Sequence, residues 1–325
     1  MVEFKEASAA FAGFVKSASS VLVSTHLNPD GDALGSALAL CHALDQLGVS
    51  HELINNNDAP HNLRFLPGVD RLRSEPTRDH DLGIVLDLDA MHRLGRAEPF
   101  FSTCKKLVVI DHHIPHEEPG DLRIVDVDAP ATAVILYRIL KEIGVAMNPS
   151  IATCLMAGIV TDTGSFRYRN TTEEALHMTA ELLHEGGNLV QIGEEVYGKK
   201  PLAGVRLLGR ALNNMQLSPD GKVAWSVLGA SAFDETGALE QNTEGIVNEL
   251  LAIQTVQVAA LIRQPSLDRK VRASLRSREP YDVAAAAREF GGGGHRNAAG
   301  VTFETDIETA TQDLIRVLHQ CVASS

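Results

Sequence analysis

The first 165 residues alternate short apolar runs with stretches of helical periodicity, and this alternation limits the possible folds more than any other feature. The short runs lie at residues 20–25, 82–87 and 107–111. Apolar residues recur at helical spacing over residues 32–47, a stretch that ends at a glycine. Strands that alternate with helices predict an α/β fold with a doubly wound, mainly parallel sheet and helices on both faces. Ligands of such sheets bind at the carboxyl ends of the strands.

The pattern changes in the second half of the chain. Residues 172–214 are helical, with a break at Gly186-Gly187, and strand-like alternation follows. A short helix, the sequence GGGGH, one more strand and a final helix complete a smaller α/β unit. We therefore predict three parts, which are a domain at residues 1–190, a helical connector at residues 191–214 and a C-terminal α/β domain at residues 215–325.

Composition restricts the function. The 325 residues include 29 Lys and Arg against 42 Asp and Glu, a formal net charge of −13. This charge argues against a protein that coats long nucleic acids, but it permits a local site for an anionic substrate, particularly one that contains metal ions. The start of the chain lacks a secretory signal pattern, and no apolar run approaches the ~18 residues that span a bilayer. The four cysteines show no CxxC spacing, so we expect a cytoplasmic protein with no membrane partner.

Acidic residues and histidines follow the ends of the apolar elements. HLNPDGD follows the first run, an aspartate ends the second, DHH ends the third, and TDTGSF follows a later apolar helix. On a doubly wound sheet these four segments converge on one rim. Carboxylates mixed with imidazoles are typical ligands of divalent metals, and imidazole favours manganese over magnesium. The candidate residues are His26, Asp30, Asp32, Asp87, Asp111, His112, His113 and Asp162.

Each segment taken alone also has an ordinary structural interpretation. Asp-Gly-Asp after Pro29 is typical of a turn and helix cap, Asp87 of a loop, and a histidine pair of a solvated loop. The ordered combination of all four segments favours a metal site instead, and the number of acids favours two ions. Two ions ~3.5–4 Å apart can hold a bridging hydroxide and both oxygens of an in-line phosphoryl displacement.

Together these segments resemble a known family. Four segments look like the four signatures of the DHH phosphoesterase superfamily, namely HLNPDGDALGS, VLDLDAMHRLG, VIDHH and GIVTDTGSF. Three later segments look like parts of the domain associated with DHH proteins, namely TEGIVNEL, ASLRS and GGGGHRNAAG. The resemblance covers nearly the whole chain. Within the superfamily, the length and arrangement are similar to the nanoRNase A group of bifunctional oligoribonucleases and 3′-phosphoadenosine-5′-phosphate (pAp) phosphatases.

The resemblance implies two divalent metal ions, with Mn²⁺ expected and Co²⁺ or Mg²⁺ as alternatives. The implied ligands are His26 and Asp30 for one ion, Asp32, His112 and Asp162 for the other, and Asp87 between the two. His113 would face the scissile phosphate, and Asp111 would orient the neighbouring histidines. Asp89 is an alternative ligand, although the family pattern favours Asp87.

The C-terminal part carries the dense group of basic residues in this acidic chain. On an alternating strand four residues share one face, namely Arg272, Ser274, Arg276 and Arg278. This face is either a solvated edge or a substrate contact. The resemblance favours contacts with the phosphate or sugar of a nucleotide by Arg276, Ser277, His295 and Arg296. The glycines of GGGGH let backbone N–H groups approach a phosphate. The expected substrate contacts are Arg93, Arg276, Ser277, Gly292, Gly293, Gly294, His295 and Arg296.

The implied activity is release of 5′-mononucleotides from very short RNA and removal of the 3′-phosphate from pAp. The expected partners are short RNA oligonucleotides, pAp and dinucleotides, with a possible homodimer and no stable complex with long nucleic acid. A manganese inorganic pyrophosphatase shares the N-terminal signatures, but GGGGHRNAAG argues against it. A hydrolase of linear or cyclic dinucleotides such as pApA is a further alternative. A non-enzymatic nucleotide-binding protein is another, although no implied metal ligand is missing.

Overall fold

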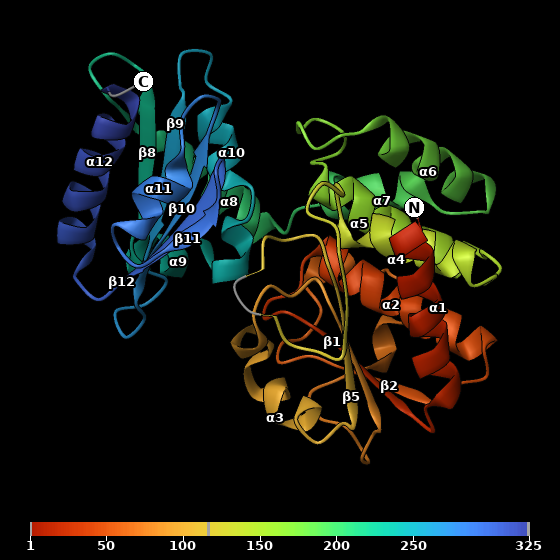
Figure 1. Ribbon diagram of the computed structural model, residues 1–325. Helices are drawn as coiled ribbons and strands as arrows, with labels where there is room; N and C mark the ends of the chain where they lie inside the picture. The colour runs from red at the N-terminus through yellow and green to blue at the C-terminus, as the bar shows by residue number, and fades with distance from the viewer. Residues whose placement is uncertain (1, 116–117, 324–325) are drawn as a thin grey trace. The chain divides into compact units, whose positions relative to one another are not determined.

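The computed structural model describes residues 2–115 and 118–323, and the chain divides into two compact units. Unit 1 comprises residues 1–199 and unit 2 comprises residues 200–325 (Figure 1). The segment expected as a connector, residues 191–214, contributes to both units. Each unit has its own six-stranded sheet and its own hydrophobic core.

The sheet of unit 1 has the strand order β3-β2-β1-β4-β5-β6, and every neighbouring pair is parallel. The strands are β1 (Val21–Thr25), β2 (His51–Ile54), β3 (Leu72–Arg73), β4 (Leu82–Leu86), β5 (Lys106–Asp111) and β6 (Leu122–Val125). This arrangement confirms the predicted parallel α/β sheet. Sequence analysis did not identify β2, β3 and β6, because they are short and only partly buried.

Helices cover both faces of this sheet, with α3 on the opposite side from α1 and α2 (Figure 1). Along β1, Val21 and Val23 point into the larger core, whereas Leu22 points into the smaller core on the other face. The larger layer contains α1 (Val2–Ser17), α2 (Gly31–Gln46), α4 (Thr132–Glu142), α5 (Pro149–Asp162), α6 (Glu173–His184) and α7 (Leu189–Ile192), followed by a π-helical turn (Gly193–Gly198). The smaller layer contains the 3₁₀-helix η3 (Met91–Ala97) and α3 (Glu98–Phe101).

The strand order reverses between β1 and β4, and this switch point is where doubly wound sheets bind ligands. Thr25, the last residue of β1, is in register with Leu86 of β4, and Leu86 is in register with Ile110 of β5. The three strands therefore end within one residue of one another. The residues that follow Thr25, Leu86 and Ile110 form one row across the rim, namely His26, Asp87 and Asp111, the last residue of β5.

Unit 2 contains a mixed sheet in the order β11-β12-β10-β9-β8-β7, in which β8 and β9 are parallel and the other pairs are antiparallel. The strands are β7 (Gln216–Leu217), β8 (Val223–Leu228), β9 (Val258–Arg263), β10 (Val271–Ser277), β11 (Gly293–His295) and β12 (Ala298–Phe303). This smaller α/β unit was predicted.

Within unit 2, α12 lies on one side of the sheet and α8 and α10 on the other (Figure 1). The helices are α8 (Leu202–Asn213), α9 (Ala230–Thr236), α10 (Ile246–Leu251), α11 (Val283–Arg288) and α12 (Ile307–Ala323), with a 3₁₀-helix η5 (Glu240–Thr243). The expected common face of β10 is correct for Arg272, Ser274 and Arg276 but wrong for Arg278. The strand ends at Ser277, and the Arg278 guanidinium donates to the carbonyl oxygens of residues 251 and 256 instead.

Two further sequence expectations concern cysteines and membranes. Cys41, Cys104 and Cys154 are free thiols, and Cys41 and Cys154 are buried. The Cys321 thiol donates to the Asp282 carbonyl oxygen. None of the helices in the described part of the chain is long and apolar enough to cross a bilayer.

Helices α2 and α5 cross closely because glycines lie at their contact. A Cβ atom at Gly35 of α2 would collide with the backbone carbonyl oxygen of Cys154 in α5. A Cβ atom at Gly158 of α5 would lie 2.6 Å from Oδ1 of Asp32, the second residue of α2. Close packing of these two helices therefore depends on the absence of side chains at Gly35 and Gly158, and it sets the position of Asp32.

We predict that Gly35→Ala lowers the midpoint of thermal unfolding, because the new methyl group forces the two helices apart at a cost of about 1–3 kcal/mol. Gly13→Ala is the matched control, since Gly13 lies in α1 and a methyl group at this position would have no other atom within 4 Å. That substitution should instead stabilise by about 0.5–1 kcal/mol through helix propensity. Thermal melts followed by circular dichroism measure both, and equal midpoints would contradict the α2–α5 packing.

Candidate metal centre

His26, the first residue after β1, is almost fully buried and faces two carboxylates. Its Nδ1 donates to the carbonyl oxygen of Leu27 at 2.7 Å, so the neutral ring has its lone pair on Nε2. Nε2 lies 3.3 Å from Oδ2 of Asp87 and 3.9 Å from Oδ1 of Asp30. The turn is fixed by buried Asn55, whose side-chain amide donates to the His26 carbonyl oxygen at 3.0 Å. Asn55 was not identified from the sequence.

His112, which follows β5, has the same arrangement. Its Nδ1 donates to the carbonyl oxygen of Ala129 at 3.1 Å, and its Nε2 faces three carboxylates. Nε2 lies 3.3 Å from Oδ2 of Asp162, 3.6 Å from Oδ1 of Asp87 and 3.9 Å from Oδ2 of Asp32. A histidine that donates through Nδ1 to a backbone carbonyl has the tautomer and orientation of a metal ligand.

Asp32 is completely buried and is held by the N-terminus of α4. Its Oδ2 accepts from the Thr132 backbone N–H at 2.6 Å and its Oδ1 from the Ala133 N–H at 2.9 Å. Ser36 adds a hydroxyl donor at 3.2 Å. The first N–H groups of a helix have no partner within the helix and carry partial positive charge, so they hold an anion well. These contacts fix the carboxylate between α2 and α4.

Asp87 occupies the central position and has an uncommon backbone conformation. Its φ angle is +57°, in the left-handed region that aspartate tolerates better than most residues. Its backbone N–H donates to Ile110 at 2.9 Å, and its Oδ1 accepts from the Thr132 hydroxyl at 2.9 Å. Thr132 therefore touches both Asp32 and Asp87, a role that sequence analysis missed. The only signal was a threonine at the start of a predicted helix.

The structure brings all six expected ligands together. Their ligand atoms form groups within 4.8 Å, namely His26–Asp30–Asp87 and Asp32–His112–Asp162, and a third group contains Asp87, His112 and His113. Asp30 also caps α2, because its Oδ1 accepts from the N–H groups of Asp32 and Ala33. The helix-cap interpretation is therefore correct for Asp30, and the same residue also lies in a group that could hold a metal ion.

Electrostatics at the cluster favour bound cations. Burial, and then repulsion from Asp87 and Asp30, raise the pKa of Asp32 well above its usual value. Burial and Asp32 raise the pKa of Asp162 in the same direction. The hydrogen bond and charge of His26 outweigh burial and lower the pKa of Asp87. Four neighbouring carboxylates carry negative charge that divalent cations would neutralise, and their oxygens together with two imidazole nitrogens fit such ions.

His113 is oriented by the aspartate that precedes the histidine pair. Oδ1 of Asp111 lies 2.8 Å from His113 Nδ1 and also accepts from the backbone N–H groups of both histidines. Burial lowers the pKa of His113, but its hydrogen bond to the Asp111 carboxylate and the charge of Asp87 outweigh burial and raise that pKa to about 9. This direct contact is consistent with the expected role of Asp111 in orienting the histidines.

Arg93, expected to contact phosphate, forms an ion pair with Asp89. The distance from its Nη1 to Oδ1 of Asp89 is 2.7 Å. Asp89 belongs to none of the three ligand groups found among the described residues. The alternative assignment of Asp89 as a metal ligand therefore has no geometric support, whereas its contact with Arg93 places a guanidinium close to the rim.

The glycines of GGGGH differ in their surroundings. Gly292 and Gly294 are packed so closely that a Cβ atom at either would collide with a backbone carbonyl oxygen of β12, and Gly294 has a φ of +138°. Gly293 is exposed and has no atom within 4 Å of a would-be Cβ. Two glycines thus keep β11 against β12, and the third leaves open backbone at the surface.

The other expected contacts in unit 2 are divided between surface and interior. His295 at the end of β11 is exposed, and Arg296 is exposed with its guanidinium donating to the carbonyl oxygen of residue 280 at 2.7 Å. Arg276 is partly buried and donates to the carbonyl oxygen of residue 275. Ser277 is buried, and its hydroxyl donates to the Tyr281 carbonyl oxygen and accepts from Asn297. Ser277 therefore joins the ASLRS strand to the GGGGHRN loop.

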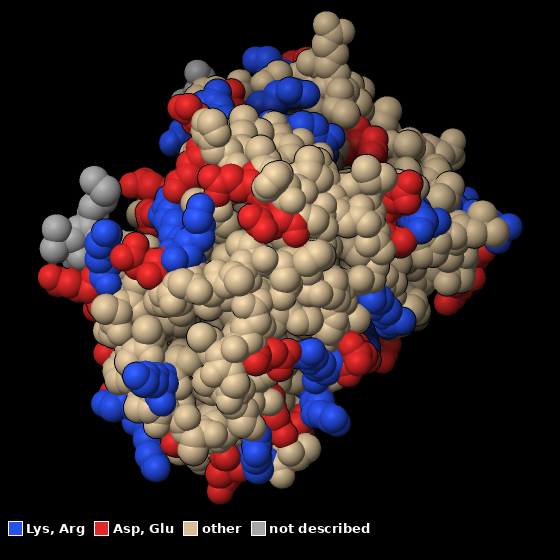
Figure 2. Space-filling view, turned by 90° about the vertical axis from the view of Figure 1, so that its right-hand side faces the viewer, with Lys and Arg blue, Asp and Glu red and all other residues tan. Residues whose placement is uncertain are grey.

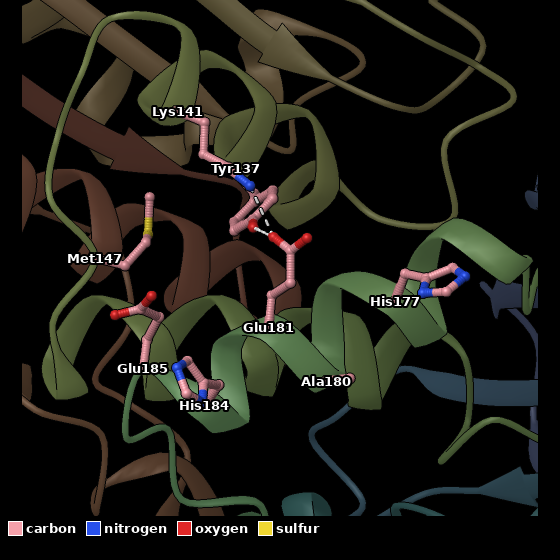
Figure 3. A pocket seen from close by; sticks show the side chains of 8 residues that line it. All are labelled: Tyr137, Lys141, Met147, His177, Ala180, Glu181, His184 and Glu185. Carbon is pink, nitrogen blue, oxygen red and sulfur yellow. Dashed lines mark hydrogen bonds and ion pairs between the residues drawn. The ribbon is translucent and has the colours of Figure 1, made fainter.

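A separate hollow lies between α4 and α6, and Figure 3 shows its lining. Glu181 points toward Tyr137 and Lys141 there, and the Lys141 Nζ lies 2.8 Å from a Glu181 oxygen. None of the lining residues is among the expected site residues. The acids and histidines at the strand ends, not this hollow, form the candidate site.

Comparison with known proteins assigns the family. The model of the DHH family, N-terminal domain, matches residues 20–159, which include five of the six expected ligands. The model of the DHHA1 domain matches residues 220–324. The bifunctional oligoribonuclease and PAP phosphatase NrnA of Thermus thermophilus is 31% identical over 305 residues, with 92% of this chain and 89% of that protein covered. The chain belongs to the DHH family. It is accordingly a phosphoric ester hydrolase.

Two further comparisons support the same DHH assignment. NrnA of Bacillus subtilis is 29% identical over 286 residues, covering 87% of this chain and 88% of that protein. The crystal structure of an exopolyphosphatase-related protein from Bacteroides fragilis superposes with a TM-score of 0.90 at 26% identity. That superposition covers 97% of this chain and 96% of the other. The fold and domain content of the DHH chain are thus those of proteins of nearly its own length.

The cluster predicts that divalent cations stabilise the protein more strongly as the pH rises. His26 has its pKa raised from 6.5 to about 9, because Asp87 and Asp30 outweigh the effect of burial. Its proton stabilises the metal-free protein below about pH 6.5, and that contribution is lost as the pH rises toward 9. A metal ligand must be unprotonated, so cation affinity increases over the same interval.

Thermal unfolding of chelated protein, with and without manganese, measures this effect. We expect manganese in large excess to raise the midpoint by roughly 5–10 °C near neutral pH, and by more when the pH is increased by about one unit. Sodium chloride at matched ionic strength is the control. A rise that sodium chloride reproduces, or one that decreases with pH, would contradict metal binding by His26.

Proposed function

We propose that this DHH protein is a two-metal phosphoesterase that hydrolyses short oligoribonucleotides to 5′-mononucleotides and pAp to AMP, with Mn²⁺ as its native metal. One observation carries the proposal, which is that the six expected ligands form two groups, one of which contains Asp87. Asp87 also lies beside the other group, since its Oδ1 is 3.6 Å from Nε2 of His112. The names of two relatives of similar length, which state oligoribonuclease and PAP phosphatase activities, support the choice of substrates.

Nitrogen ligands support manganese over magnesium. His26 and His112 each present Nε2 to the carboxylates, and magnesium prefers oxygen ligands. Bound divalent cations would supply positive charge to the phosphoryl oxygens and would acidify an attacking water. Asp87, with one oxygen toward each histidine, would set the spacing of the two ions.

The chain's own residues would prepare the site for charge that develops on the phosphate. The Asp111 carboxylate holds His113 and stabilises positive charge on its ring, so His113 would donate a hydrogen bond to a phosphoryl oxygen. Thr132 and the N-terminus of α4 hold Asp32 and Asp87 in place without reorganisation. Arg93 would provide a further positive group, released from Asp89 when phosphate binds.

Unit 2 would recognise the nucleotide. The exposed backbone of Gly293 and the exposed ring of His295 would contact its phosphate or sugar, together with Arg276 and Arg296. Ser277 would act by positioning these groups, since its hydroxyl has backbone and side-chain partners of its own. This division leaves the chemistry to unit 1 and the choice of substrate to unit 2.

Surface charge supports short substrates. On the face shown in Figure 2, Lys and Arg side chains lie beside Asp and Glu, and no continuous basic surface is seen among the residues drawn there. The net charge of the chain is −13. A long polyanion would gain little from such a surface, because neutralisation of many phosphates supplies most of the affinity for long strands.

A substrate panel tests the proposed function. Chelated protein should be inactive, and manganese or cobalt should restore hydrolysis of 5′-labelled RNA of two to five nucleotides and of pAp. Labelled RNA of about 24 nucleotides should be a poor substrate, because it gains little from the acidic surface. Resolution of the products by electrophoresis or chromatography identifies mononucleotides and AMP. Full activity in chelator, or hydrolysis of pyrophosphate alone, would contradict the proposal.

Two neighbouring aspartates give a matched test of the bridging position. Asp87→Asn should lower kcat by more than about 100-fold, since both ions lose a shared ligand while asparagine still tolerates the positive φ. Asp89→Asn weakens the ion pair with Arg93 but leaves the three ligand groups intact, so it should cost less than about tenfold. Steady-state rates on a dinucleotide and bound-metal content measure both, and a reversed order of the two losses would refute the assignment of Asp87.

A further inference from the structure

One face of the sheet in unit 2 is covered over only part of its width. On this face α8, α9 and α10 bury the side chains of β8 and β9, including Ala224 and Leu261. The neighbouring strands β10 and β12 present partly or fully exposed residues on the same face, among them Ser274 and its register partner Gly300. A Cβ atom at Gly300 would have only the Ala273 carbonyl oxygen nearby, at 3.8 Å. The uncovered half of the face is therefore an open floor.

Two arginines at the edge of this floor share one carboxylate. Arg263 at the end of β9 is in register with Arg272 of β10. Oε1 of Glu240, from η5, lies 3.4 Å from Arg263 Nε and 3.1 Å from Arg272 Nη1. In the described part of the chain neither arginine has another carboxylate within ion-pair distance. Together, the two arginines and Glu240 therefore keep a net positive charge.

One of the two arginines is fixed in place and the other is accessible to an anion. The Arg263 side chain is 15% exposed and donates to the Ser274 hydroxyl at 2.8 Å, so it is fixed in place. The Arg272 side chain is 48% exposed and can turn toward the open floor. A phosphate would stabilise two neighbouring guanidinium groups of which one is largely buried, because the fork of N–H groups of arginine matches phosphate oxygens.

The spacing of the arginines along β10 indicates which phosphate of a substrate Arg272 would bind. Arg272 and Arg276 lie on the same face four residues apart, or about 13–14 Å along the strand. Neighbouring phosphates of an oligonucleotide lie closer together than this distance, whereas two phosphates that are separated by two phosphodiester links can span it. If Arg276 contacts the nucleotide that is cleaved, as in the proposed function, Arg272 lies where the chain of a longer oligonucleotide continues.

We propose that Arg272, supported by Arg263 and Ser274, is a second phosphate subsite that binds oligoribonucleotides of three or more nucleotides beyond the nucleotide held by Arg276. This proposal rests on the proposed function and extends it from the reacting nucleotide to the rest of the substrate. Glu240 occupies the two arginines when substrate is absent and competes with the phosphate. The subsite would give longer members of the substrate range a lower KM than pAp or a dinucleotide.

The test compares substrates of different length in Arg272→Ala. We expect KM for a 5′-phosphorylated tetranucleotide to rise about three- to tenfold with kcat nearly unchanged, as for loss of a partly exposed charged contact. KM for pAp and for a dinucleotide should not change. The slope of log KM for the tetranucleotide against log salt should decrease by about 0.7, the value for one phosphate contact on a single strand.

Two further variants sharpen the test. Arg316→Ala is the matched control, because Arg316 is an exposed, ion-paired arginine of α12, which packs against the opposite face of the sheet. It should leave every KM unchanged. Glu240→Gln keeps the shape of the side chain but removes the competing charge, so it should lower KM for the tetranucleotide while Arg272→Ala raises it.

The outcomes separate the subsite from the proposed function. An unchanged tetranucleotide KM in Arg272→Ala, or an equal rise for pAp and tetranucleotide, would overturn the subsite even though wild-type protein hydrolyses both. Wild-type protein that hydrolyses neither substrate would overturn the proposed function itself. A length-dependent rise in Arg272→Ala with the opposite change in Glu240→Gln would establish the subsite.

Discussion

The buried carboxylate of Asp32 at the N-terminus of α4 is the contact on which the rest of unit 1 depends. It receives two backbone N–H groups from residues a hundred positions away, and this ties α2 to α4. The close approach of α5 at Gly158 then brings Asp162 to the same place. A charge buried this deeply is stable only when its surroundings are polar and fixed, and helix N–H groups meet that need. The candidate ligand cluster is thus built into the packing of three helices.

The sheet supplies the other half of the site. Because β1, β4 and β5 are parallel and end within one residue of one another, His26, Asp87 and Asp111 lie side by side near the point where the strand order reverses. These residues were predictable, since each follows an apolar run and their order resembles a known family. Thr132 and Asn55 were not predictable, because their hydrogen bonds depend on tertiary approach and their types are common in loops and helix starts. The short strand β3 left no periodic signal of its own.

In unit 2 the period-two pattern of a strand predicted one face for Arg272, Ser274 and Arg276, and the register of β10 agrees. The same pattern failed at Arg278, because alternation cannot show where a strand ends, and Arg278 instead binds two backbone carbonyl groups. The partnership of Arg272 with Glu240 was likewise invisible, since the two residues are 32 positions apart. The contacts that organise this face of unit 2 are therefore visible only in the folded chain.

The central claim is that two cations share Asp87. Anomalous diffraction from crystals grown with Mn²⁺, measured at the manganese absorption edge, tests it most directly. We expect two peaks about 3.5–4 Å apart, one beside His26 and Asp30, the other beside Asp32, His112 and Asp162, and both in contact with Asp87. A single peak, or two peaks of which only one contacts Asp87, would contradict the account.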